Sequence, residues 1–329
     1  MADITGDTNL QTGRDAALRS FAFRDWRFRL LTQIAAVIVV ALFVGIIGLL
    51  AQGAWPAVKA FGWNFLTTST WNPVTEKFGA FPLIYGTLVT SALAMLVAVP
   101  VGIGIAIFLT ELCPRPLKRP IGIAVELLAG IPSIIYGIWG FFIFAPFFQQ
   151  TAEPWIIALF ANVPILQDLF AGPPFGIGVF TASFILSIMI LPFISSVTRD
   201  VFETVPAILK EAAYGLGCTT WEVMWRIVLP YTRSGVVGGA MLALGRALGE
   251  TMAVTFVVGN AHHINASILA PGTTISATIA NEFAEALGDL YIPALIEAGL
   301  ILFLITFIVL ASAQLMLRSI ERRSGGGSR

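Results

Sequence analysis

Residues 211–230 read EAAYGLGCTTWEVMWRIVLP, and they lie between two apolar segments that are each long enough to span a bilayer. Thr219 followed three residues later by Glu222 fits a capping box, which predicts that a helix begins there. Gly215 or Gly217 would end the helix before it, because glycine readily adopts the left-handed conformation found after helix C-termini. The stretch therefore predicts two short helices joined by a turn.

Both predicted helices carry an apolar face. The first would begin near Thr204 and Pro206, and the second would stop at Pro230. At helical spacing, the first carries Ile208, Leu209, Ala212, Ala213 and Leu216, and the second carries Trp221, Met224, Trp225 and Val228. Exposed apolar surface of this kind usually marks a site for a partner. The alternative is a loop that packs on its own helix bundle.

The composition of the chain is that of a membrane protein. Hydrophobic residues make up 57% of the 329 residues and charged residues 12%, about half the charged share of soluble domains. A helix must satisfy its own backbone in lipid, so each apolar run of about 20 residues predicts one transmembrane helix. Six such runs cover residues 30–51, 83–109, 121–148, 176–198, 233–258 and 292–316. The sequence therefore predicts an all-α integral membrane protein with six transmembrane helices.

Basic residues predict the orientation. Sixteen of the 19 Lys and Arg residues lie in the tails and loops of one side, and two, Lys59 and Lys77, lie on the other. The positive-inside rule then places both termini in the cytoplasm. The predicted parts are a cytosolic tail over 1–29, the first helix and outer loop over 30–82, a membrane core over 83–316 that contains the cytosolic loop 199–232, and a cytosolic tail over 317–329.

One charged pair is predicted inside the membrane. Arg246 would lie roughly 20 Å into the span 233–258, at 1.5 Å per residue, where an arginine costs ~2.5–3.5 kcal/mol. Glu250 would lie one helical turn further on the same face. A guanidinium group binds tetrahedral oxyanions. A carboxylate can accept a hydrogen bond from phosphate, which carries a proton at neutral pH, but not from sulfate, which carries none. The alternative is an internal ion pair that only fixes helix packing, although the Arg-before-Glu order is the weaker one.

Prolines Pro100, Pro132 and Pro192 are expected to interrupt the second, third and fourth spans, because proline removes a helix hydrogen bond. Such breaks suit a gated pathway. They are also common in membrane proteins of any function.

The spacing within the cytosolic loop resembles the EAA loop of permease subunits of bacterial ABC importers. The residues that carry this resemblance are Glu211, Ala212, Ala213, Gly217, Ile227, Leu229 and Pro230. In that family the loop is the surface on which an ATPase acts. The resemblance implies a type I, MetI-like permease fold with cytosolic coupling helices, located in the bacterial inner membrane.

Three further stretches resemble the permeases of phosphate importers. They are GRALGETMA at 245–253, IPSIIYG at 131–137 and TIANEF at 278–283, so that the resemblance extends over roughly residues 80–316. The long first outer loop is similar to the PstC type of these permeases more than to the PstA type. The family implies that Arg246 and Glu250 lie on the phosphate pathway.

The same resemblance implies partners: a homologous permease, PstA, a dimer of the ATPase PstB, and a periplasmic phosphate-binding protein, PstS. The chain has no GxxxxGK[ST] loop, so we expect ATP and Mg to bind the separate ATPase and this chain to be no enzyme. No cofactor is expected on the chain itself, and the adjacent His262 and His263 lack the spacing of a metal site. Its neutral net charge argues against nucleic acid.

Other functions stay open at this point. An importer for sulfate or molybdate would share the EAA loop, but as a rule not the GRALGETMA stretch. A secondary transporter or channel would usually show inverted repeats with paired broken helices, and none is visible here. A membrane scaffold or phosphate sensor would move nothing.

Overall fold

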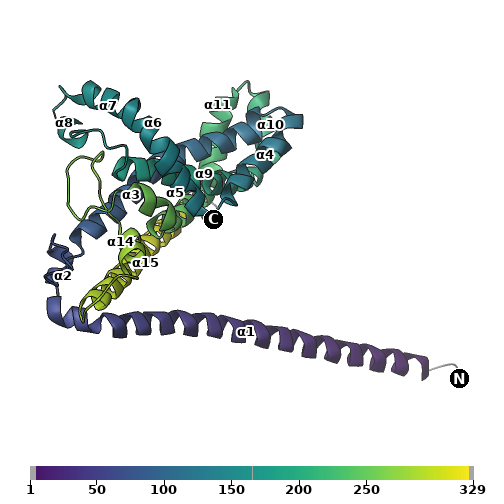
Figure 1. The fold of residues 1–329 in the computed structure, drawn as a ribbon. Coiled ribbons are helices and arrows are strands. Elements are labelled where there is room, and N and C mark those ends of the chain that lie inside the picture. Colours follow the sequence, from purple (N-terminus) through teal and green to yellow (C-terminus); the bar gives the residue numbers. More distant parts are fainter. Residues whose placement is uncertain (1–4, 165, 326–329) are drawn as a thin grey trace. The chain divides into compact units, whose positions relative to one another are not determined.

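The computed structural model describes residues 5–164 and 166–325. Helices dominate this part of the chain, and the β-structure found in it is one isolated bridge between Asn72 and Lys77. The chain forms two compact units, Met1–Gly53 and Ala54–Arg329. The first unit holds most of α1, a helix that runs from Thr5 to Phe61 and whose last residues belong to the second unit (Figure 1).

Five helical segments of the described chain are long and apolar enough to cross a membrane, or six if one bent pair counts as a single span. The first is Arg24–Phe61 of α1. The other four are α3 (Phe81–Ile107) with the π-helix η1 (Phe108–Leu112), α9 (Val179–Glu203), the run of α11 (Thr220–Val223), η3 (Met224–Val228) and α12 (Leu229–Leu248), and α15 (Tyr291–Gly325). The predicted all-α membrane fold is confirmed.

The third predicted span, 121–148, is not one straight helix. α4 (Arg115–Ala129) is followed after a short break by α5 (Ser133–Trp139), η2 (Gly140–Phe144) and α6 (Ala145–Gln150), and the two parts are bent by 88°. The break contains Pro132, whose ψ of 137° is extended. Pro100 and Pro192, in contrast, lie inside α3 and α9 without ending them. The expectation that all three prolines interrupt their spans is therefore wrong for two of them.

The fifth predicted span, 233–258, is also divided. α12 ends at Leu248, and α13 (Met252–Val257) begins after a gap of three residues. At its other end α12 continues from the loop 199–232 through η3, and Pro230 lies in its first turn. Proline is tolerated in the first turn of a helix, where its missing N–H would have no helical partner. The helical run therefore continues through Pro230, and the prediction that Pro230 stops the preceding helix is wrong.

Shorter helices connect the spans. They are α2 (Asn64–Thr67), α7 (Ala152–Phe160), α8 (Leu166–Leu169), α10 (Ala207–Gly215) and α14 (Ile275–Glu282). α10 begins at Ala207 after Pro206 and forms, with α11, the predicted pair of short helices in the loop 199–232.

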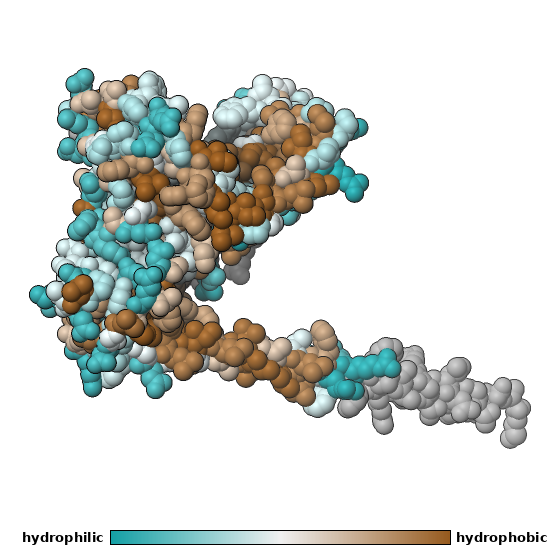
Figure 2. Space-filling view, in the orientation of Figure 1, coloured by the Kyte–Doolittle hydropathy of each residue, from teal (hydrophilic) through white to brown (hydrophobic). Residues whose placement is uncertain are grey.

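α9 is the central helix of the second unit. In its most apolar window 67% of the residues are buried, compared with 28% for α3 and for α15. It packs along α3, α12 and α13 around a core that includes Ile185, Ile190 and Ile194. Large apolar side chains nevertheless remain on the surface (Figure 2), among them Leu96 and Phe142 at 72% and 69% exposure. Such a surface fits lipid as the solvent.

The close packing of α3 gives a first prediction. A Cβ on Gly86 would overlap the backbone oxygen of Thr273, whereas a Cβ on Gly104 in the same helix would meet no atom within 4 Å. We expect Gly86→Ala to lower the unfolding free energy by about 1–3 kcal/mol, because backbone has to move. Gly104→Ala should be neutral or raise it by up to ~1 kcal/mol through helix propensity.

Thermal unfolding of the two purified variants in detergent, side by side with the parent chain, checks this pair. Equal melting temperatures for both variants would show that the contact between α3 and Thr273 is loose.

Candidate functional site

Arg246 lies in the last turn of α12, and its side chain is exposed. The C-terminal end of a helix carries a partial negative charge, which favours a cation at this position. The backbone groups that follow are released from the helix at Gly249. Arg246 therefore places a permanent positive charge beside a break in a membrane-spanning helix.

Glu250 lies in that break and not in the helix. Its carboxylate accepts a hydrogen bond at 3.5 Å from the backbone N–H of Ala253 in α13, and its backbone oxygen accepts one at 2.9 Å from Ser276 Oγ of α14. The prediction that Glu250 lies one turn from Arg246 on the same helical face is wrong, because α12 ends at Leu248. In the part of the chain that the structure describes, the two side chains form no ion pair with each other.

Two of the three stretches, 131–137 and 245–253, meet at this break, and Ser276, two residues before the third stretch at 278–283, also contacts it. A Cβ on Gly137 of α5 would lie 3.0 Å from the backbone oxygen of Met252 and 3.2 Å from Ala253 Cα. Only glycine allows two backbones to approach so closely. On the other side, α14 packs against α13 and donates the Ser276 bond to Glu250. α5, more than 100 residues before the break, and α14, whose Ser276 is 26 residues from Glu250, thus enclose one pair of helix ends.

The turn between α10 and α11 explains the spacing from Ala213 to Gly217. Gly217 has a φ of +83°, which glycine adopts without strain. Cys218 N–H donates to the Ala213 carbonyl at 3.1 Å and Gly217 N–H to the Tyr214 carbonyl at 2.9 Å, the bond pattern of a Schellman C-cap. Ala213 itself is 5% exposed in the core below α10.

The capping box at the start of α11 is confirmed. Thr219 Oγ1 accepts a bond from the Glu222 N–H at 3.3 Å, and Glu222 Oε2 accepts one from the Thr219 N–H at 2.9 Å. Glu211, Ala212, Gly217 and Pro230 are exposed, while Ile227 and Leu229 are half-buried.

The apolar residues of α10, α11 and η3 point in two directions. Met224 and Val228 are 1% and 0% exposed and fill the core cluster beneath the loop. Four others face outward: Ile208, Leu216, Trp221 and Trp225 are 72%, 86%, 65% and 51% exposed, and the two Trp rings lie 5.3 Å apart. We call these four residues the knob surface. Sequence periodicity assigned one apolar face to each helix, but on the second face Met224 and Val228 support the loop, whereas Trp221 and Trp225 are exposed in the described part of the chain.

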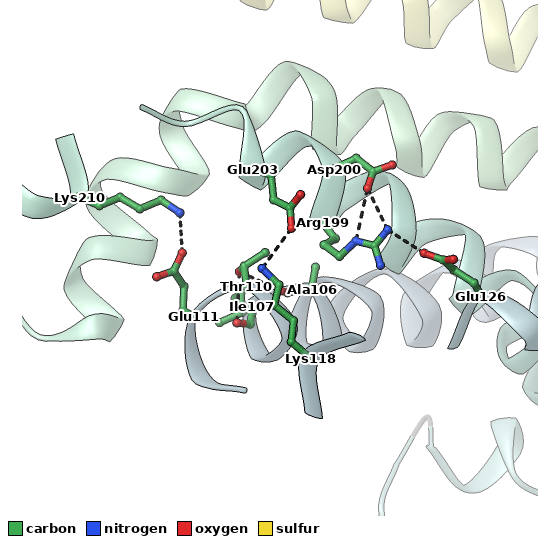
Figure 3. A network of polar contacts seen from close by, with 10 residues as sticks. All are labelled: Ala106, Ile107, Thr110, Glu111, Lys118, Glu126, Arg199, Asp200, Glu203 and Lys210. Carbon is green, nitrogen blue, oxygen red and sulfur yellow. Dashed lines mark hydrogen bonds and ion pairs between the residues drawn. The ribbon is translucent and has the colours of Figure 1, made fainter. Parts of the chain in front are cut away.

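Ion pairs connect the helices around the knob (Figure 3). Lys210 Nζ of α10 lies 2.5 Å from Glu111 Oε1 of η1, Arg199 of α9 lies 2.7 Å from Glu126 of α4, and Lys118 Nζ of α4 lies 3.2 Å from Glu203 of α9. The sequence carried no signal for these pairs, because their members are up to 99 residues apart.

A second polar cluster surrounds Glu282 at the end of α14. Its carboxylate accepts hydrogen bonds from Trp71 Nε1 at 2.8 Å and Tyr291 OH at 2.6 Å, and lies 2.7 Å from His262 Nε2. Burial disfavours its charged form, but the bonds with His262, Tyr291 and Trp71 outweigh burial and lower the pKa of the Glu282 carboxyl. The contacts of the Glu282 carboxylate therefore connect three segments: the loop after α2, the loop after α13 and the start of α15.

This cluster gives a pH-dependent prediction. A carboxyl whose pKa is lowered on folding stabilises the protein above its unfolded pKa of about 4.3, and that stabilisation is lost as pH falls through the folded pKa. We expect Glu282→Gln to lower the melting temperature at pH 7, and the gap to the parent chain to shrink below about pH 4.

Melting curves of purified protein between pH 3 and 7 measure this gap. Asp168→Asn, which alters an exposed acid, should follow the parent chain throughout. A gap for Glu282→Gln that stays constant with pH would contradict the assignment.

Comparison with known proteins gives consistent results. Residues 98–324 match the family described as binding-protein-dependent transport system inner membrane component. The chain is 64% identical to the phosphate transport system permease protein PstC of Mesorhizobium japonicum, with 96% of this chain and 97% of that protein covered. It is 57% identical to the protein of the same name from Pasteurella multocida, over 91% and 93% of the two chains.

Solved structures show the same fold at low sequence identity. A chain of a bacterial ABC transporter involved in the import of the acidic polysaccharide alginate aligns with a TM-score of 0.59 at 20% identity, covering 92% of this chain and 99% of that one. A second crystal structure of a bacterial alginate ABC transporter, in complex with a periplasmic protein that carries an alginate pentasaccharide, aligns with a TM-score of 0.59 at 17% identity, over 90% and 96% of the chains.

Proposed function

The chain belongs to the family of binding-protein-dependent transport system inner membrane components, and on that premise we propose that it is the membrane-spanning permease subunit of an ATP-driven phosphate importer. The observation that carries the proposal is the near full-length match, at 64% identity, to a phosphate transport system permease protein. The chain is a multi-pass membrane protein, and the basic tails and loops support an orientation with both termini in the cytoplasm.

Arg246 and Glu250 are proposed to contact phosphate during passage. Arg246 is exposed on its own chain, so its guanidinium is available to a ligand or to a neighbouring subunit. A charged fork of N–H donors beside a helix break favours a tetrahedral oxyanion. Glu250 keeps the local positive charge from trapping the anion and offers an acceptor for the proton that phosphate carries at neutral pH. Sulfate lacks that proton and would be repelled.

Energy is proposed to come from a separate ATPase. Glu211, Ala212, Ala213, Gly217, Ile227, Leu229 and Pro230 shape the loop that the ATPase contacts, and the knob surface offers it apolar side chains. ATP and Mg would bind that subunit, and this chain would perform no hydrolysis. The proposed complete importer contains this chain, a homologous permease of the PstA type, a dimer of the ATPase PstB and the periplasmic phosphate-binding protein PstS.

Phosphate uptake tests the pathway. We expect cells that lack their own high-affinity phosphate importer to take up radiolabelled phosphate when this chain is supplied with its partner subunits. Arg246→Ala should reduce uptake at least about tenfold, because a charge-assisted hydrogen bond contributes about 1.5–3 kcal/mol. Arg318→Ala, which changes an exposed arginine near the C-terminus, is the matched control.

Excess unlabelled sulfate distinguishes the substrate. Uptake that ignores sulfate and is lost in Arg246→Ala supports the proposal. Strong competition by sulfate would favour an importer for another oxyanion. Normal uptake by Arg246→Ala would remove that residue from the pathway.

The knob surface gives a separate prediction. Leu216 is 86% exposed, so Leu216→Asp should fold normally but place a charge in the ATPase interface. We expect the amount of ATPase that co-purifies with the permease to fall at least about tenfold, since a buried unpaired charge is costly.

Val74→Asp supplies the control, because Val74 is 92% exposed in the first outer loop. This substitution should leave the amount of co-purified ATPase unchanged. If Leu216→Asp retains the full amount of ATPase, the knob surface does not form the interface.

A further inference from the structure

The ion pair between Lys210 and Glu111 differs from its neighbours in burial. The Nζ–Oε1 distance is 2.5 Å, and the side chains are only 18% and 12% exposed. Lys118 and Glu203, on the same side of the unit, are 41% and 52% exposed. An exposed pair is screened by water and contributes little. In this partly buried pair, each charge depends more on the other, because removing one leaves the second without a partner where water reaches it poorly.

The pair connects the EAA loop to a membrane span. Lys210 directly precedes Glu211 on α10, and Glu111 lies on η1, the π-helix that continues α3. Single π-turns of this kind occur often at functional sites. The hydroxyl of the neighbouring Thr110 donates a hydrogen bond to the Ala106 carbonyl at 2.9 Å (Figure 3). α3 in turn packs along the central helix α9 over most of its length.

A second contact between α10 and the bundle is apolar. Ala213 of α10 belongs to a core cluster with Ala106 of α3 and Phe202 of α9. Apolar contacts have no preferred direction and allow small residues to slide over one another. A short ion pair fixes both distance and direction, so it determines how a displacement of α10 is passed to α3.

We propose that Lys210 and Glu111 are a positioning pair that transmits movement of the ATPase-contacting loop to α3, and thereby to the α3–α9 pair in the membrane. The inference rests on the proposed function, since it requires an ATPase that moves α10. Neither residue touches phosphate or nucleotide. Their loss should uncouple ATP hydrolysis from transport while leaving hydrolysis itself in place.

The test measures phosphate transported per ATP hydrolysed, with the complete complex of this chain and its partner subunits in proteoliposomes. The variants are Lys210→Ala, Glu111→Ala, and the exchange Lys210→Glu with Glu111→Lys. The control is Lys118→Ala, which breaks the exposed pair between α4 and α9. Co-purification of the subunits is recorded for every variant.

We expect each single variant to lower the transport-to-hydrolysis ratio at least about fivefold, the lower range of coupling between sites. The exchange variant should recover most of the ratio, because it restores opposite charges at the same positions. Lys118→Ala should remain within about twofold of the parent complex, as for an exposed pair.

The inference is overturned if the single variants keep the parent ratio of phosphate transported to ATP hydrolysed. It is also overturned if the exchange variant assembles but stays uncoupled. Failure of all of these variants to assemble would overturn it as well, because the pair would then be needed for folding. A parent complex that neither transports phosphate nor hydrolyses ATP would instead contradict the proposed function, and is thereby distinguished.

Discussion

Backbone hydrogen bonding in lipid is the constraint on which the rest of this structure depends. A helix that ends inside the hydrocarbon leaves N–H and C=O groups without partners, so it is tolerated only where protein or a polar cavity surrounds it. The described residues contain two interruptions of apolar helices, around Pro132 and at Gly249–Thr251. They lie against each other, with Gly137 packed on Met252 and Ser276 bonded to the Glu250 backbone. The positive charge of Arg246 lies at the edge of this arrangement.

The loop between α9 and α12 is held in a different way. There the loop is held by local bonds, the Schellman turn after α10 and the capping box before α11, so its shape is set by few residues. One set of apolar side chains anchors it and the knob surface remains free. Lys210–Glu111 then connects the loop to α3 at a fixed position. A rigid loop with a directional connection can pass on a displacement, whereas a flexible one would absorb it.

Comparison of the sequence predictions with the structure separates local from distant causes. The capping box at Thr219 and the glycine turn at Gly217 were predictable, because both depend on hydrogen bonds within a few residues. The continuous spans over 121–148 and 233–258 and the stop at Pro230 were wrong. Hydropathy records only how apolar a segment is, and the predicted spans continue as apolar sequence on both sides of each break. The roles of Arg246, Glu250 and the coupling residues remain predictions.

The sequence by itself determined the solvent of this protein, its helical class, the capped turns of the loop 199–232 and, through its motifs, its family. These depend on composition and on short-range spacing. Only the tertiary structure decided that α12 ends between Arg246 and Glu250, that α5 and α14 pack against the break, and that Lys210 meets Glu111. These contacts join residues 26 to more than 100 positions apart, so the small size of Gly137 and the charge of Glu111 take their roles from the helices packed against them.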